Sequence, residues 1–236
     1  TGNIDIEKNE IDGLEQGISS HWWEPQSSGS TTGIIPDSTW MEPNSQIMSL
    51  LYESNQSMEI AYGWDLSDNQ WLIRVYLSDG PATEVTFNDS KTMQAYVFGD
   101  GSGNKFRFCV DDNMPSTSSS NHEVSPWFII DWVGWKSVSW DMDIDGTGEW
   151  IGDGNLNGNM RFDSFQLSYI EGQSQFGRIY IDDLSLFSTT SLKTLDNNIS
   201  EVFKIGKNYP NPFNTETMIP LLLTDNRKIK VIITDI

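Results

Sequence analysis

Six polar and aromatic side chains have the chemistry needed to bind a carbohydrate. Sugar rings stack through their C–H faces on exposed aromatic rings, while guanidinium and amide groups hydrogen-bond the hydroxyls. By strand alternation these six point away from the apolar sets; they are Arg74, Tyr76, Gln94, Tyr96, Arg107 and Gln166. If their strands adjoin, one sheet face would form a glycan-binding surface. The alternative is a solvated face on which arginine stems cover apolar area.

Two adjacent tryptophans, Trp22 and Trp23, form a second candidate for stacking on a sugar. Neighbouring residues of an extended segment point to opposite sides, so at most one of the two can lie in a core. We take Trp22 as the candidate ligand-binding residue. A contact between subunits would explain an exposed tryptophan equally well.

The segment Asp141–Gly146 carries carboxylates at alternate positions and ends in glycine. This is the first half of an EF-hand calcium loop, in which the glycine permits a sharp turn. The glutamate that closes such a loop is missing, because Gly152 stands at its position. Two alternatives therefore stay open, a calcium site formed by Asp141, Asp143 and Asp145 and a solvated acidic loop.

Little in the sequence supports catalysis. The single cysteine, Cys109, lies in an alternating segment and is predicted to be a packed structural thiol. His21 and His122 have no partner residues at the spacing of a zinc site or a catalytic triad. A glycosidase needs two carboxylates roughly 5–10 Å apart across a cleft, which a sandwich without a long insertion does not offer. We therefore expect a protein that is not an enzyme.

Alternating segments carry most of these side chains. Met58–Trp64 and Trp71–Leu77 show the two-residue period of half-buried strands. Further strands are predicted at Met93–Phe98, Phe106–Val110, Trp127–Asp131, Val138–Met142, Phe162–Tyr169 and Arg178–Phe187. Turns rich in glycine, aspartate and asparagine separate them, and no segment keeps a helical apolar stripe. The pattern predicts an all-β fold, an antiparallel jelly-roll β-sandwich.

The charge of the 236-residue chain excludes some partners. It has 14 basic and 34 acidic residues, a net charge of −20, which would repel a phosphate backbone. A nucleic-acid partner is therefore not expected. No apolar run approaches the roughly 20 residues of a membrane helix, so no membrane span is expected either. The first residues lack the pattern of a signal peptide, so we expect that a signal was removed or that the chain is a fragment.

Composition changes after residue 188. Residues 1–188 carry 8 basic and 29 acidic side chains, whereas residues 189–236 carry 6 and 5. The sequence thus predicts a β-sandwich domain over residues 1–188, a polar linker over 189–200 and a separate C-terminal unit over 201–236.

The C-terminal unit contains the segment Asn208–Asn214, NYPNPFN, followed by Thr217–Leu221 and Lys230–Ile236. It resembles the start of a type IX secretion sorting domain, although Thr215 stands where that family usually has proline. The resemblance implies export across the outer membrane of a Gram-negative bacterium, then release or attachment at the cell surface. Its two or three strands are too few for a freestanding sheet, so we expect residues 201–236 to add strands to another sheet, within the chain or in a second copy.

Three features of the larger domain carry a second resemblance. They are the glycine-rich segment Tyr96–Asn104, the tryptophan-rich segment Ile130–Trp140 and the closing strand Ile179–Leu184. In this order and spacing, residues 11–188 resemble the galactose-binding-like jelly rolls that serve as carbohydrate-binding modules. The resemblance implies a jelly roll that binds glycans.

The same resemblance implies a structural calcium ion between the first and last strands. The corresponding positions are Glu15, Asp182 and Asp183. Asp182 would lie on a strand face among apolar residues, and a buried carboxylate needs a partner or a metal.

Together these observations predict a secreted, non-catalytic protein that binds a polysaccharide or another glycan at the cell surface. The alternative is a structural subunit of an extracellular filament or surface layer, self-associating through residues 201–236.

Overall fold

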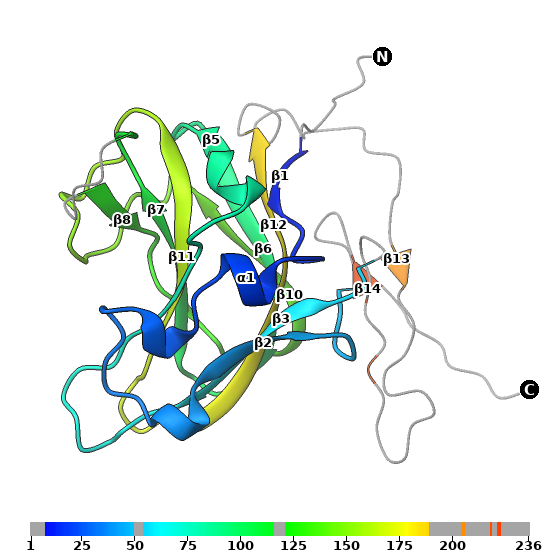
Figure 1. Cartoon of the computed structure of the whole chain (residues 1–236), viewed down its shortest axis with the longest axis vertical. Coiled ribbons are helices and arrows are strands. Elements are labelled where there is room, and N and C mark those ends of the chain that lie inside the picture. The colour runs from blue at the N-terminus through cyan, green and yellow to red at the C-terminus, as the bar shows by residue number, and fades with distance from the viewer. Residues whose placement is uncertain are drawn as a thin grey trace, which may run out of the picture. The chain divides into compact units, whose positions relative to one another are not determined.

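The structure is a computed structural model that describes the following residues: 8–49, 54–115, 121–188, Lys204–Ile205, Met218 and Leu221–Leu222. The chain divides into two compact units, Thr1–Thr194 and Leu195–Ile236 (Figure 1).

The first sheet comprises six strands among the described residues, all paired antiparallel. Its strands are β1 (Lys8–Asp12), β2 (Trp40–Asn44), β3 (Ser57–Gly63), β6 (Lys91–Asp100), β10 (Val133–Asp141) and β12 (Phe176–Ser188). They lie in the order β10-β6-β12-β3-β2, and β1 pairs with the C-terminal half of β12. The long strand β12 is therefore the central strand of the sheet, paired with β6, β3 and β1.

The second sheet also has six antiparallel strands within the described part of the chain. They are β4 (Ile73–Tyr76), β5 (Thr86–Phe87), β7 (Lys105–Asp111), β8 (His122–Val124), β9 (Phe128–Ile129) and β11 (Met160–Ser168). The order is β4-β11-β7-β8, with β5 paired to β11 and β9 paired to β7. Figure 1 shows β7, β8 and β11 on one side of this unit and β3, β6, β10 and β12 on the other.

Helical structure is confined to four short segments in the described ranges. They are α1 (Ile18–His21), η1 (Pro25–Ser27), η2 (Pro36–Ser38) and η3 (Pro81–Glu84). Each of the three 3-10 turns begins with proline, whose fixed φ suits the first helical position. Within these ranges, no helix has both the length and the apolar character of a membrane span.

The inner faces of the two sheets share one hydrophobic core. Phe165 of β11 is fully buried, and its ring lies 4.8 Å from that of Phe162 and 5.8 Å from that of Phe106. Ile60 of β3 and Ile181 of β12 belong to the same core from the opposite sheet. This arrangement confirms the predicted fold class, an all-β antiparallel β-sandwich.

Most predicted strands correspond to observed ones, and the differences have a topological cause. The strand predicted at Trp127–Asp131 is reduced to β9, because the chain leaves the second sheet after Ile129 and enters the first at Val133. For the same reason, the strand predicted at Val138–Met142 starts earlier, at Val133, which pairs with Asp100. The strands β1, β2 and β8 were missed because their sequences do not alternate.

The smaller unit lies mainly outside the described residues, including most of the segment resembling a sorting domain. Within it, β13 (Lys204–Ile205) pairs antiparallel with β14 (Leu221–Leu222). Self-association through residues 201–236 stays a prediction.

Candidate functional site

A row of three polar side chains crosses the outer face of the second sheet. Gln166 of β11 is in register with Arg74 of β4 on one side and with Arg107 of β7 on the other. The residues flanking Gln166 in sequence, Phe165 and Leu167, point inward to the core. Strand alternation therefore correctly placed four of the six predicted glycan-binding side chains on one face: these three and Tyr76, two residues after Arg74 on β4.

Two members of this row are held rigidly. The Nε atom of Arg107 donates to the Oε1 atom of Gln166 at 2.8 Å, and its Nη1 atom donates to the carbonyl of Glu149 at 3.0 Å. Burial lowers the pKa of Arg107 to about 10, so the guanidinium stays charged at neutral pH. Among the described residues, no carboxylate forms an ion pair with Arg107. Its charge is therefore stabilised by these two oxygen acceptors and by aromatic rings.

Arg74, in contrast, forms a buried ion pair. Its Nη2 and Nε atoms lie 2.5 and 3.1 Å from the two carboxylate oxygens of Asp163, which also accepts a hydrogen bond from the Ser164 hydroxyl at 2.6 Å. Burial lowers the pKa of Arg74, but the charge of Asp163, its hydrogen bond and smaller contributions together outweigh this effect, so the pKa is raised overall. Sequence analysis missed Asp163 because it lies at an irregularity in the β11–β7 pairing, where alternation fails.

Two tryptophans from loops cover the arginine row. The Cζ atom of Arg107 lies 3.9 Å from the centre of the Trp127 ring and 6.0 Å from that of Trp150. The same Trp150 ring lies 5.9 Å from the Cζ atom of Arg74. Both tryptophans are partly exposed. Trp150 belongs to a segment for which no strand was predicted, and Trp127 opens the predicted strand Trp127–Asp131 but lies before β9 in the structure. Neither was predicted to bind a ligand.

Tyr76 and Trp23 extend this aromatic surface. The Arg74 Cζ atom lies 4.5 Å from the Tyr76 ring centre, and the rings of Tyr76 and Trp23 meet edge to face at 5.2 Å. Trp23 is 45% exposed. We call the four residues Trp23, Tyr76, Trp127 and Trp150 the aromatic platform.

The prediction that Trp22 would bind ligand is wrong. Its side chain is only 3% exposed and stacks on Phe165 in the core, with ring centres 5.3 Å apart. The Nε1 atom of Trp22 donates to the Asp12 carboxylate at 3.0 Å. Of the tryptophan pair, Trp23 is the one available at the surface.

Two further predicted residues, Gln94 and Tyr96, do not join the platform. Both lie on β6, which belongs to the first sheet, and Tyr96 is in register with Asp182. The prediction of one common face fails for them because the chain crosses to the opposite sheet between β5 and β6.

A charged cluster borders the platform. His122 Nδ1 lies 2.5 Å from Asp111 Oδ1 without the direction of a regular hydrogen bond, and Asp111 raises the pKa of His122 above its ordinary value. Trp150 stacks on His122, with ring centres 5.7 Å apart.

Ligand atoms of Asp111, His122 and Asp163 lie within 4.8 Å of one another, as a metal site would require. Arg161 pairs with Asp111 and Arg74 pairs with Asp163. The two carboxylates are therefore already neutralised, which disfavours a divalent cation at this cluster.

The residues implied as calcium ligands do come together. Glu15, Asp182 and Asp183 line a hollow of about 50 Å³, which Glu10 also borders. Asp182 and Asp183 are consecutive, yet both reach this hollow, because β12 is irregular there and Asp183 has a φ of 49°. The irregularity overrides the alternation that would send neighbouring side chains to opposite faces.

The charge of this hollow is predominantly negative. Lys8 donates to both oxygens of Asp183, at 2.7 and 2.9 Å. Asp182 accepts a hydrogen bond from the Ser49 amide at 2.9 Å, but burial and the nearby charge of Glu15 raise its pKa to about 7. Carboxylate oxygens are the ligands that calcium prefers, and calcium binding at this hollow stays a prediction.

The acidic loop at Asp141–Gly146 is a hydrogen-bonded turn. The Asp145 carboxylate accepts from the Asp141 amide at 2.9 Å, and the Asp141 carboxylate accepts from the amides of Asp143 and Ile144, each at 3.2 Å. Gly146 has a φ of 65°, which only glycine adopts readily. Calcium binding at this loop stays a prediction.

Comparisons with known proteins find a similarity in fold to solved structures. No protein-family model and no curated protein sequence matches the chain. Among solved structures, the chain is similar to a family 11 carbohydrate-binding module from Clostridium thermocellum in complex with a β-1,3-1,4-mixed-linked tetrasaccharide. That match has a TM-score of 0.50 and 16% identity, and it covers 77% of this chain and 96% of that module.

Two further structures show weaker similarity. The family 11 module of a cellulosomal cellulase from the same organism has a TM-score of 0.49 at 14% identity, with 78% and 96% of the two chains covered. A family 27 module from Caldicellulosiruptor saccharolyticus in complex with mannohexaose has a TM-score of 0.42 at 10% identity, with 77% and 97% covered. At 16% identity, the match with a TM-score of 0.50 shows the fold alone, a β-sandwich like that of the family 11 module.

Proposed function

We propose that this chain is a non-catalytic glycan-binding module whose ligand lies on the outer face of the second sheet. The observation that carries the proposal is the aromatic platform, which lies over guanidinium and amide groups. The similarity in fold to the family 11 module with its bound tetrasaccharide supports it. So do the partial exposure of Tyr76, Trp127 and Trp150 and the 45% exposure of Trp23.

In this proposal, the platform rings stack on the apolar faces of successive sugar units. The buried Arg107 and the ion-paired Arg74 hold Trp127, Trp150 and Tyr76 in place through cation–π contacts. Rings that are held in place before binding lose little conformational entropy when a glycan arrives. Because Arg107 and Gln166 are buried, hydrogen bonds from this row to sugar hydroxyls would come from Arg74, which is partly exposed.

Replacing Trp150 by alanine is expected to weaken binding to soluble mixed-linkage β-1,3-1,4-glucan by about 10-fold to 100-fold, because one aromatic anchor is removed. Tyr76→Ala should have a similar effect. Affinity gel electrophoresis measures both. The matched control is Trp135→Ala, which removes a partly exposed tryptophan of the first sheet that packs on Phe98. Unchanged affinity in both platform variants would contradict this site.

We further propose that calcium binds in the hollow of Glu15, Asp182 and Asp183 and stabilises the fold. Calcium at about 100 times its dissociation constant is expected to raise the melting temperature of chelator-treated protein by about 5–10 °C. Asp182→Asn should abolish this shift, whereas Asp143→Asn should retain it. A shift lost only in Asp143→Asn would move the site to the acidic loop, and no shift in the parent protein would disprove both.

Secretion is also part of the proposal. Its support is the resemblance of residues 208–236 to a type IX sorting domain, which implies a Gram-negative origin and an extracellular or cell-surface location.

A further inference from the structure

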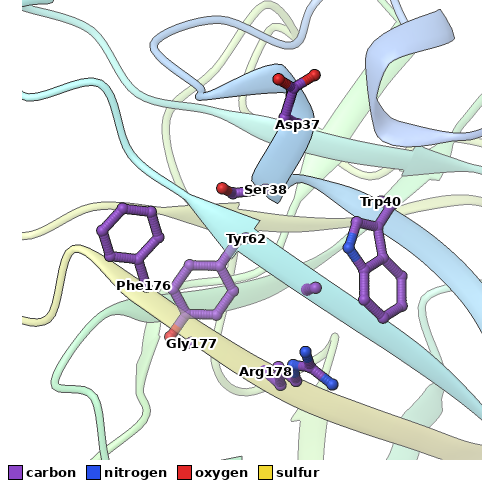
Figure 2. A pocket seen from close by; sticks show the side chains of 8 residues that line it. Asp37, Ser38, Trp40, Tyr62, Phe176, Gly177 and Arg178 are labelled. Atoms are coloured by element: carbon purple, nitrogen blue, oxygen red, sulfur yellow. The ribbon is translucent and has the colours of Figure 1, made fainter.

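A pocket opens on the first sheet, the opposite sheet from the aromatic platform. Its volume is about 410 Å³, within the range of roughly 300–1,000 Å³ typical of small-molecule sites. It lies over strands β2, β3 and β12, beside η2. Figure 2 shows Trp40 and Phe176 on opposite sides of the pocket, with Asp37 at one end and Arg178 at the other.

The sizes of the side chains on the three neighbouring strands create this pocket. Ala61 of β3 is in register with Trp40 of β2 and with Arg178 of β12, so a small side chain lies between two large ones. The next outward position of β3 is Gly63, opposite Phe176. A Cβ atom there would lie 2.9 Å from the Phe176 ring and 2.7 Å from the Ser38 Cβ atom. The small residues Ala61 and Gly63 of β3 therefore leave the space that forms the pocket.

The walls of the pocket expose aromatic surface to solvent. Phe176 is 53% exposed, and Trp40 is partly exposed. The Arg178 guanidinium lies 5.3 Å from the Trp40 ring centre, so the tryptophan is oriented by a cation. Exposed aromatic rings that flank a hollow are typical of a ligand-binding surface.

The charges of the pocket disfavour an anionic ligand. Asp37 offers an exposed carboxylate, and Arg178 contributes a guanidinium whose Nη1 atom pairs with Glu59 at 3.0 Å. An anion would be repelled by Asp37 and by the net charge of the chain, and Glu59 already offsets the charge of Arg178. A ligand rich in hydroxyls can donate to the carboxylate and accept from the guanidinium at the same time.

We propose that this pocket is a second saccharide-binding site, specific for a short segment of a neutral glycan. Trp40 and Phe176 stack on sugar rings from two sides, while Asp37 and Arg178 bond hydroxyls at the two ends. The class of ligand rests on the proposed function of the chain, but the site shares no residue with the platform.

Two sites on opposite sheets would make the chain bivalent. One glycan chain cannot lie on both outer faces along a straight path, so two chains would be bound and cross-linked. Binding to a polymer would then benefit from effective concentration, and loss of either site is expected to weaken it by about 10-fold to 100-fold.

The test titrates three variants with the β-1,3-1,4-mixed-linked tetrasaccharide and with mannohexaose by calorimetry. Ala61→Leu fills the floor of the pocket, Trp40→Ala removes one wall, and Trp150→Ala removes part of the platform. Ala61→Ser, which adds one oxygen atom, is the matched control. Thermal melting of each variant checks that the fold is retained.

The expected result is about two saccharides bound per parent chain and about one in Ala61→Leu, in Trp40→Ala and in Trp150→Ala. If both pocket variants still bound about two saccharides per chain while Trp150→Ala bound about one, the second site would be overturned and the proposed function would stand. If only the two pocket variants bound fewer saccharides than the parent chain, the result would support the pocket and overturn the platform. A parent chain that binds neither saccharide would overturn both.

Discussion

Phe165→Ala is expected to lower the free energy of unfolding by about 3–5 kcal/mol, because it opens a cavity at the centre of the core. The Phe165 side chain is fully buried. Its ring centre lies 5.3 Å from Trp22, 4.8 Å from Phe162 and 6.2 Å from Phe108. Urea unfolding followed by tryptophan fluorescence measures the change, which should appear as a lower midpoint.

Phe176→Ala is the matched control for this substitution. It removes the same atoms from a side chain that is 53% exposed, so the expected loss is only about 0.5 kcal/mol. Equal losses in the two variants would show that the Phe165 cluster is not the packed centre of the sandwich.

Asp163→Asn is expected to cost about 3–5 kcal/mol of stability, because it leaves the Arg74 guanidinium without its counter-ion in a buried position. The Asp163 side chain is fully buried, and that of Arg74 is 14% exposed. The substitution also weakens the hydrogen bond that the Ser164 hydroxyl donates to the Asp163 carboxylate, because an amide is a weaker acceptor. Chemical unfolding at neutral pH measures this loss.

A double variant separates the ion pair from the cost of burying charge. Arg74→Met combined with Asp163→Leu removes both charges and keeps apolar volume, so much of the lost stability should return. If the double variant were as unstable as Asp163→Asn, the loss would come from local packing and not from the unpaired charge. Because Arg74 also lies against Tyr76 and Trp150, the double variant should weaken glycan binding as well.

Part of the candidate site follows from local alternation. A strand sends successive side chains to opposite faces, so the outward position of Arg74, Arg107 and Gln166 could be predicted from neighbouring apolar residues. The same rule places Cys109, two residues after Arg107 on β7, on this face and outside the core shared by the two sheets. Its thiol is packed there as predicted, because it is fully buried, and this burial raises its pKa.

Residues at irregular positions escaped this rule. Asp163 and Asp183 lie where strand pairing shifts, so their side chains do not follow the alternation. Trp127 and Trp150 lie in loops of the structure, where alternation does not say which way a side chain points. The site as observed depends on these irregular residues as much as on the regular ones.

The amino-acid sequence by itself determined the all-β class, the approximate position of most long strands and the face to which their side chains point. These properties depend on residues next to one another in the chain. Tertiary structure alone decided that Gln94 and Tyr96 belong to a different sheet from Arg74, and that Trp22 is buried while Trp23 is exposed. The physical reason is that strand pairing and burial depend on contacts between distant segments, and alternation along one strand contains no information about its partners.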